Sequence, residues 1–236
     1  MRNTLAIAGR ELQTYFVSPI AYVVAATFLA ISGYLFAAIL LLSREATLLY
    51  LFSNLTTILL FVTPLLTMRL LAEEQKSGTL ELLLTSPVQD WEVVLGKWLA
   101  SLGLFAAIIL LTGYYPLILW RYGNPDWGPV LSGYVGLLLL GGAMLALGTL
   151  ASALTSNQIV AAVLGVGLIV LAWLVDALSQ FVGPPLAGVL TYLSLGTHFF
   201  DFLRGIVDTK DIVYYLSVIV LALFLSTRVL ETRRWR

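Results

Sequence analysis

The chain has 236 residues, of which 60% are hydrophobic and 11% are charged, and it has no net formal charge and no cysteine. Soluble domains carry about 25% charged residues, so this composition excludes a soluble protein and is typical of an integral membrane protein. A neutral chain does not indicate a nucleic-acid partner, and the lack of cysteine excludes disulfides and thiol chemistry.

Six segments predict transmembrane helices, because crossing the hydrocarbon core takes about 20 predominantly apolar residues. The predicted spans cover residues 19–42, 46–68, 98–120, 130–153, 158–176 and 212–228. The fourth and fifth come from one long charge-free run, which the polar cluster at residues 155–158 divides at a turn. The predicted fold is an all-α integral membrane protein with a single transmembrane domain over residues 1–236.

The segment before the first span predicts an amphipathic helix lying along the membrane interface. Its apolar residues recur at helical spacing: Leu5, Ala8, Leu12, Tyr15 and Phe16. Nine Lys and Arg residues fall on the N-terminal side of the membrane and four on the other. Because positive residues accumulate in cytoplasmic loops, we expect both termini to be cytoplasmic.

A charged stretch, Arg69–Lys97, separates the second and third spans and must lie in water. We expect the second span to continue as a helix to Ser77 and to end at Gly78. A short transverse helix over residues 79–85 would follow, and Ser86-Pro87-Val88-Gln89 predicts a capping box that starts the next helix. The alternative is a solvated loop with surface charge, but apolar leucines at positions 80 and 82–84 favour a docking surface.

The connection after the fifth span, residues 177–211, is apolar but interrupted by Gly and Pro. This pattern predicts one or two short re-entrant helices in the outer leaflet. The single histidine of the chain, His198, lies here and is interpreted as an interfacial polar ring beside Phe199 and Phe200.

The middle of each predicted span lacks Asp, Glu, Lys, Arg and His. Ion-coupled transporters need such groups, so the pattern argues against secondary transport and against intramembrane hydrolysis. The chain also lacks the G-x-x-x-x-G-K nucleotide-binding sequence. In the fourth span Gly142/Ala146 and Gly148/Ser152 have small-xxx-small spacing, which allows close helix packing either within the chain or at a seam between subunits.

The run TMRLLAEEQKSGTLELLLTSPVQDWEVVLGK resembles the ABC-2 type transporter permeases and, among them, the gliding-motility-associated branch. The resemblance covers most of the chain up to about residue 165. Its other parts are Glu11-Leu12, Ser18–Tyr22, Gly123-Asn124 with Asp126, and Leu154–Ile159.

The resemblance implies a permease subunit of an exporter, multi-pass in the bacterial cytoplasmic membrane and surrounded by lipid, with no enzymatic site, metal or cofactor of its own. A separate ABC ATPase subunit would bind ATP and Mg. A second permease copy or paralogue would complete the unit, and branch members often work with a partner carrying a large extracytoplasmic domain. The residues carried onto the element that couples the permease to the ATPase are Glu73, Glu74, Gly78, Thr79, Glu81, Thr85, Ser86 and Pro87.

Two alternatives stay open at this point. A haem-exporter permease also has six spans and no ATPase domain, although the motif disfavours it. A membrane anchor that recruits an ATPase or signalling complex without transporting anything would likewise keep a docking surface and need no substrate path.

Overall fold

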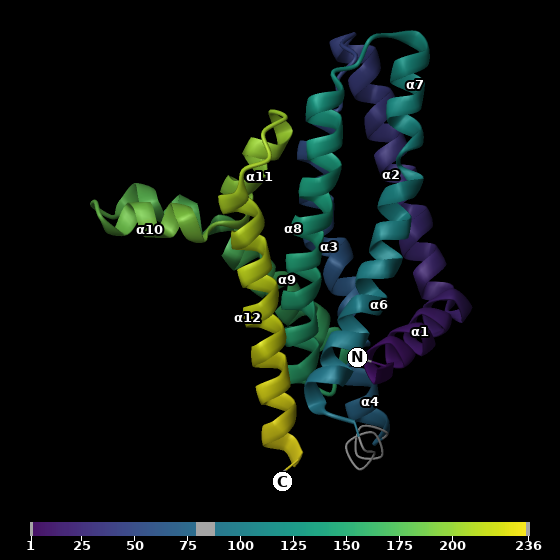
Figure 1. Ribbon diagram of the computed structural model, residues 1–236, viewed down its shortest axis with the longest axis vertical. Helices are drawn as coiled ribbons and strands as arrows, with labels where there is room; N and C mark the ends of the chain where they lie inside the picture. The colour runs from purple at the N-terminus through teal and green to yellow at the C-terminus, as the bar shows by residue number, and fades with distance from the viewer. Residues whose placement is uncertain (1, 79–87, 235–236) are drawn as a thin grey trace.

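The computed structural model describes residues 2–78 and 88–234, which form a bundle of helices (Figure 1). Within these residues there is no β-strand. The elements are α1 (Arg2–Val17), α2 (Pro19–Ser43), α3 (Leu49–Thr67), α4 (Ala72–Ser77), α6 (Asp90–Leu111), α7 (Tyr114–Tyr122), α8 (Trp127–Leu154), α9 (Gln158–Leu174), the 3-10 helix η1 (Val175–Phe181), α10 (Leu186–Leu193), α11 (Leu195–Leu203) and α12 (Thr209–Arg234).

Six helical stretches in the described chain are long and apolar enough to cross a membrane, which confirms the predicted number of spans. The third begins at Asp90, because the helix predicted to lead into the apolar span over residues 98–120 is continuous with it. The six stretches are Pro19–Ser43, Leu49–Ser77, Asp90–Tyr122, Trp127–Leu154, Gln158–Phe181 and Thr209–Thr232.

Helix α8 forms the centre of the bundle and packs against α3, α6, α9, α11 and α12 (Figure 1). Its glycines allow this close approach, because a Cβ added at any of three positions would overlap an aromatic ring of a neighbouring helix. The added atom would lie 2.4 Å from Phe52 at Gly133, 2.7 Å from Phe202 at Gly136 and 2.2 Å from Phe105 at Gly141. The small residues of the fourth span therefore position the helices around it.

The third span is broken between α6 and α7, where Thr112 and Gly113 lie outside both helices. Pro116 has no N–H to donate to the Thr112 carbonyl four residues earlier. That carbonyl accepts hydrogen bonds from the Tyr115 N–H at 3.0 Å and from the Tyr134 hydroxyl of α8 at 2.8 Å. A side chain of the central helix thus adds a second hydrogen bond where the proline removes the regular helical one.

The connection between the fifth and sixth spans contains the short helices predicted there, with α10 and α11 bent by 67° relative to each other. Helix α10 projects sideways from the bundle (Figure 1) and buries none of its residues within the chain. Its depth in a membrane, and hence its re-entrant character, stays a prediction.

The side chain of His198 is buried against neighbouring helices of the chain, and its place at the membrane interface stays a prediction. Its Nδ1 lies 2.6 Å from Asp211 Oδ1, and its Nε2 lies 2.9 Å from the Tyr192 carbonyl oxygen. The ring stacks on Tyr214 at 3.9 Å between centroids. Asp211 is fully buried in the first turn of α12, so this pair fixes the start of the sixth span against α10 and α11.

Candidate functional site

A buried lysine joins three elements at the end of the bundle where the charged stretch begins. Lys97, on α6, is only 2% exposed. Its Nζ lies 3.1 Å from Glu11 Oε2 of α1 and 2.9 Å from Glu74 Oε1 of α4. A buried ammonium needs such partners, because removal from water disfavours an isolated charge by several kcal/mol. We call Glu11, Glu74 and Lys97 the ion triad.

Next to the ion triad lies a cavity of about 190 Å³ between α1, the end of α3, α4 and α6. Its charged lining consists of the three triad residues together with Arg10, Arg69 and Glu73. Three cations and three carboxylates make the cavity neutral overall, so it shows no preference for a strongly anionic or cationic ligand. Its polar groups instead bond to one another and hold the surrounding helices together.

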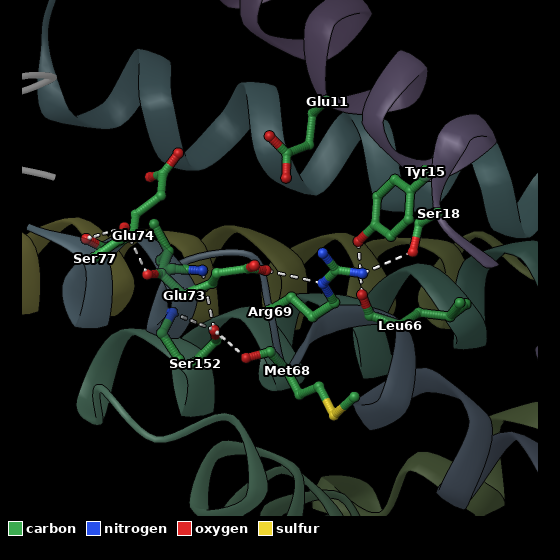
Figure 2. Close-up of polar contacts among 12 residues, drawn as sticks. Glu11, Tyr15, Ser18, Leu66, Met68, Arg69, Glu73, Glu74, Ser77 and Ser152 are labelled. Atoms are coloured by element: carbon green, nitrogen blue, oxygen red, sulfur yellow. Dashed lines mark hydrogen bonds and ion pairs between the residues drawn. The ribbon is translucent and has the colours of Figure 1, made fainter. Parts of the chain in front are cut away.

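Arg69 forms a second link between the start of the first span and α4. Figure 2 shows its guanidinium between Glu73 and Ser18: Nε donates to Glu73 Oε2 at 2.9 Å, and Nη1 donates to Ser18 Oγ at 2.8 Å. Beside it, the Tyr15 hydroxyl of α1 donates to the Leu66 carbonyl at 2.6 Å. Burial raises the pKa of the Tyr15 hydroxyl, so this group remains protonated and available as a donor.

The second span continues to Ser77 as predicted. Its regular α-helix is interrupted between Thr67, where α3 ends, and Ala72, where α4 begins. The hydroxyl of Ser152, from α8, fills the gap (Figure 2): it donates to the Met68 carbonyl at 3.1 Å and accepts from the N–H groups of Leu71 and Ala72 at 3.1 and 3.0 Å. One side chain therefore satisfies three backbone groups at the break.

The other small residues of the fourth span lie at contacts with helices of the same chain. A Cβ at Gly148 would lie 2.1 Å from the Thr67 hydroxyl of α3, and one at Gly142 would lie 3.5 Å from Ile219 of α12. Ala146 is fully buried. Together with Ser152, these residues line the surfaces where α8 meets α3 and α12.

Within the charged stretch, the end of α4 and the start of α6 both have defined helix caps. Helix α4 ends at Gly78, whose φ of 72° is left-handed, as expected for a glycine that ends a helix. Helix α6 begins at Asp90 with Gln89 as its N-cap. The Glu92 carboxylate accepts from the Gln89 N–H at 3.2 Å and from the Asn3 amide at 3.1 Å. Gln89 and Glu92 therefore form a capping box at this start, while the capping box predicted at Ser86 lies outside the described residues.

Among the residues predicted to couple the permease to an ATPase, three are described. Glu74 belongs to the ion triad, Glu73 pairs with Arg69, and Gly78 ends α4. The transverse helix predicted over residues 79–85 lies outside the described residues. The same is true of these predicted coupling residues: Thr79, Glu81, Thr85, Ser86 and Pro87.

Residues 42–227 match the family described as ABC-2 family transporter protein. The chain belongs to this family. It is also similar to the probable multidrug ABC transporter permease YbhR of Escherichia coli strain K12 and of Escherichia coli O157:H7, at 33% identity over 89 residues in each case. That alignment covers 37% of this chain and 23% of each relative, so the matched part spans about a quarter of their length. Family membership implies the membrane-spanning permease part of an ABC transporter.

In this ABC-2 permease the sequence did not indicate the partners of Lys97. Both of them are far away in sequence, and the bond to Glu11 joins residues 86 positions apart. A usable signal was present, since a lysine at the start of an apolar span needs a carboxylate partner if it is buried. Glu11 interrupts the apolar pattern of α1 and was the natural candidate.

Proposed function

We propose that this chain is the permease subunit of an ABC exporter, in which a separate ATPase docks on α4 and the residues that follow it. The ion triad carries the proposal. It fastens α1 and α4 to α6 at the end of the bundle where the chain leaves the second span and enters the third. A displacement of α4 by a docked ATPase would therefore be passed to α6 through two charge-assisted hydrogen bonds.

The working unit we propose has two permease chains, either identical or paralogous, and two ATPase subunits that bind ATP and Mg. The energy must come from such partners if the chain transports, because the middle of its spans carries no ionisable group to bind a coupling ion. We place the chain in the gliding-motility-associated branch on the motif between Arg69 and Lys97. A partner with a large extracytoplasmic domain would accompany it there.

We further propose that transport is outward, across the bacterial cytoplasmic membrane, and that the cargo is apolar or amphipathic. The E. coli relatives are named as probable multidrug permeases, which supports a cargo of this kind. The uniformly apolar spans suit the same cargo, because they offer no charged group to a polar solute.

The test is to co-express the chain with its candidate ATPase, reconstitute the complex in liposomes and measure ATP hydrolysis with and without the permease. Stimulation by the permease, together with ATP-dependent movement of a hydrophobic dye, supports the proposal. An ATPase that binds and hydrolyses ATP without moving any cargo would favour the membrane anchor, and no association would refute the docking surface.

Gly78→Val provides a directed variant of the same experiment. Gly78 has a left-handed φ of 72°, which is unfavourable by about 1–2 kcal/mol for any residue that carries a side chain. The substitution should therefore change the backbone direction at the end of α4 while the spans stay folded. We expect reduced stimulation of the ATPase. The matched control is Gly167→Val on α9, where an added Cβ meets nothing within 4 Å. Equal stimulation by both variants would contradict a coupling role for Gly78.

A further inference from the structure

An apolar groove of about 350 Å³ lies between the start of α6 and the last turns of α12. This volume is in the range of pockets that bind small ligands. Helix α6 contributes Trp91, Val94 and Leu95, and α12 contributes apolar side chains from Val220 to Phe224. Neither the ion triad nor the predicted coupling residues line this groove.

The groove is polar at one end only. Its polar lining residues are Thr227, Arg228 and Glu231, which all follow the apolar ones along α12. The guanidinium of Arg228 lies over the Phe224 ring at 5.0 Å and donates through Nη1 to Glu231 at 2.6 Å. The Arg228 side chain is 60% exposed, so its remaining donors can reach a ligand. The groove therefore suits a molecule with an apolar tail and an anionic head.

The length of the groove indicates which molecule this is. From Val220 to Arg228, at the polar end, the chain advances eight residues, or about 12 Å at 1.5 Å per residue. The hydrocarbon core of a bilayer is about 30 Å thick, so one leaflet contributes about 15 Å. Figure 1 shows the C-terminal end of α12 at the same end of the bundle as α4, which the charge count predicts to be cytoplasmic. The groove therefore accommodates most of an acyl chain of the leaflet on that side, with the head group at Arg228.

The free donors of Arg228 point to an anionic head group, because Glu231 bonds to only one of its guanidinium nitrogens. Three further arginines follow in the sequence at positions 233, 234 and 236. Basic clusters at the cytoplasmic end of a transmembrane helix attract anionic lipids, and basic pockets between helices bind their phosphate groups. We propose that this groove is a binding site for one anionic phospholipid, whose acyl chain lies between α6 and α12 and whose phosphate binds Arg228.

The test uses the full-length chain in nanodiscs of phosphatidylcholine with a minority of phosphatidylglycerol. After transfer to mild detergent, mass spectrometry counts the lipids that each protein molecule retains. We expect the wild type to keep phosphatidylglycerol in preference to phosphatidylcholine, and Arg228→Gln to reduce this preference about fivefold. The matched control is Arg121→Gln, which removes an exposed arginine in the last turn of α7, at the other end of the third span from Trp91.

Two further measurements separate the head from the tail. Leu223→Trp fills the apolar part of the groove and should lower retention of phosphatidylglycerol without affecting Arg228. Glycerol phosphate, which has the head chemistry without an acyl chain, should not displace the bound lipid. A wild-type chain that retains both lipids equally would overturn the proposal, as would an Arg228→Gln variant that keeps the wild-type preference. Displacement by glycerol phosphate, or full retention by Leu223→Trp, would refute the acyl-chain groove.

Discussion

Replacing Lys97 by Met tests whether the ion triad holds α1, α4 and α6 together. The substitution keeps the length and apolar stem of the side chain but removes the ammonium group. Two carboxylates then face each other across the position that the cation occupied. They belong to Glu11 and Glu74, whose side chains are 22% and 26% exposed.

The size of the effect follows from this partial exposure. Breaking a buried ion pair by removing one partner costs about 3–5 kcal/mol, because the other charge is left unpaired. Here both remaining carboxylates keep some contact with water, so we expect the lower end, about 3 kcal/mol. For a chain of this size each kcal/mol lowers Tm by about 2–4 °C, which gives a loss of about 6–12 °C.

The assay is thermal unfolding of the purified chain in detergent, followed by tryptophan fluorescence. The triple variant Glu11→Gln, Glu74→Gln, Lys97→Met provides the matched control, because it removes all three charges and leaves none unpaired. Neutral replacement of a whole buried ion network is often harmless, so the triple variant should recover most of the lost Tm. A Lys97→Met variant with the wild-type Tm would refute the reasoning, and a triple variant as unstable as Lys97→Met would show that the loss is steric.

Three further substitutions test other parts of the fold, each read out as a change in Tm. Gly148→Ala should lower the free energy of unfolding by about 1–3 kcal/mol, since its Cβ would lie 2.1 Å from a threonine hydroxyl of α3. The control Gly167→Ala, on α9, places its Cβ in open space and should be neutral or stabilising. Asp211→Asn, which removes the buried carboxylate that contacts the His198 ring, should cost about 1–3 kcal/mol, and the loss should exceed that of Asp201→Asn, whose pair with a lysine is partly exposed. The pKa of Asp208 is lowered first by a hydrogen bond from the backbone N–H of Lys210 and then by the Lys210 ammonium group. The ionised Asp208 carboxylate therefore stabilises the fold above about pH 4, and this contribution disappears as the pH falls through the lowered pKa. The Tm values of wild type and Asp208→Asn should accordingly converge in acid. A gap in Tm that widened at low pH would contradict this sign.

The spans were predictable because their signal is local. Hydrophobic length fixes where a helix can cross, and all six crossings follow from it. The end of α4 was predictable for the same reason, since Gly78 can adopt a left-handed φ without the steric cost of a side chain. The glycines of α8 also indicated close packing, although not which helices they contact.

The polar contacts were not predictable, because they join residues that are far apart in sequence. Nothing near Ser152 shows that its hydroxyl completes the turn at Met68, which lies 84 positions away. The partners of His198 were not predictable for a similar reason, since its surroundings in sequence are aromatic and Asp211 lies on the next helix. The capping box of Gln89 and Glu92 at the start of α6 was not predicted, although both residues lie close together in sequence.

The hydroxyl of Ser152 has a mechanical consequence. Because it bonds to both sides of the break after α3, α4 is attached to α8 as well as to the span that precedes it in sequence. A force applied to α4 is thus shared with the most enclosed helix of the bundle, and α8 in turn contacts α3, α6, α9, α11 and α12. A local push at one end of the molecule can therefore shift the whole bundle, instead of bending a single helix at its weakest point.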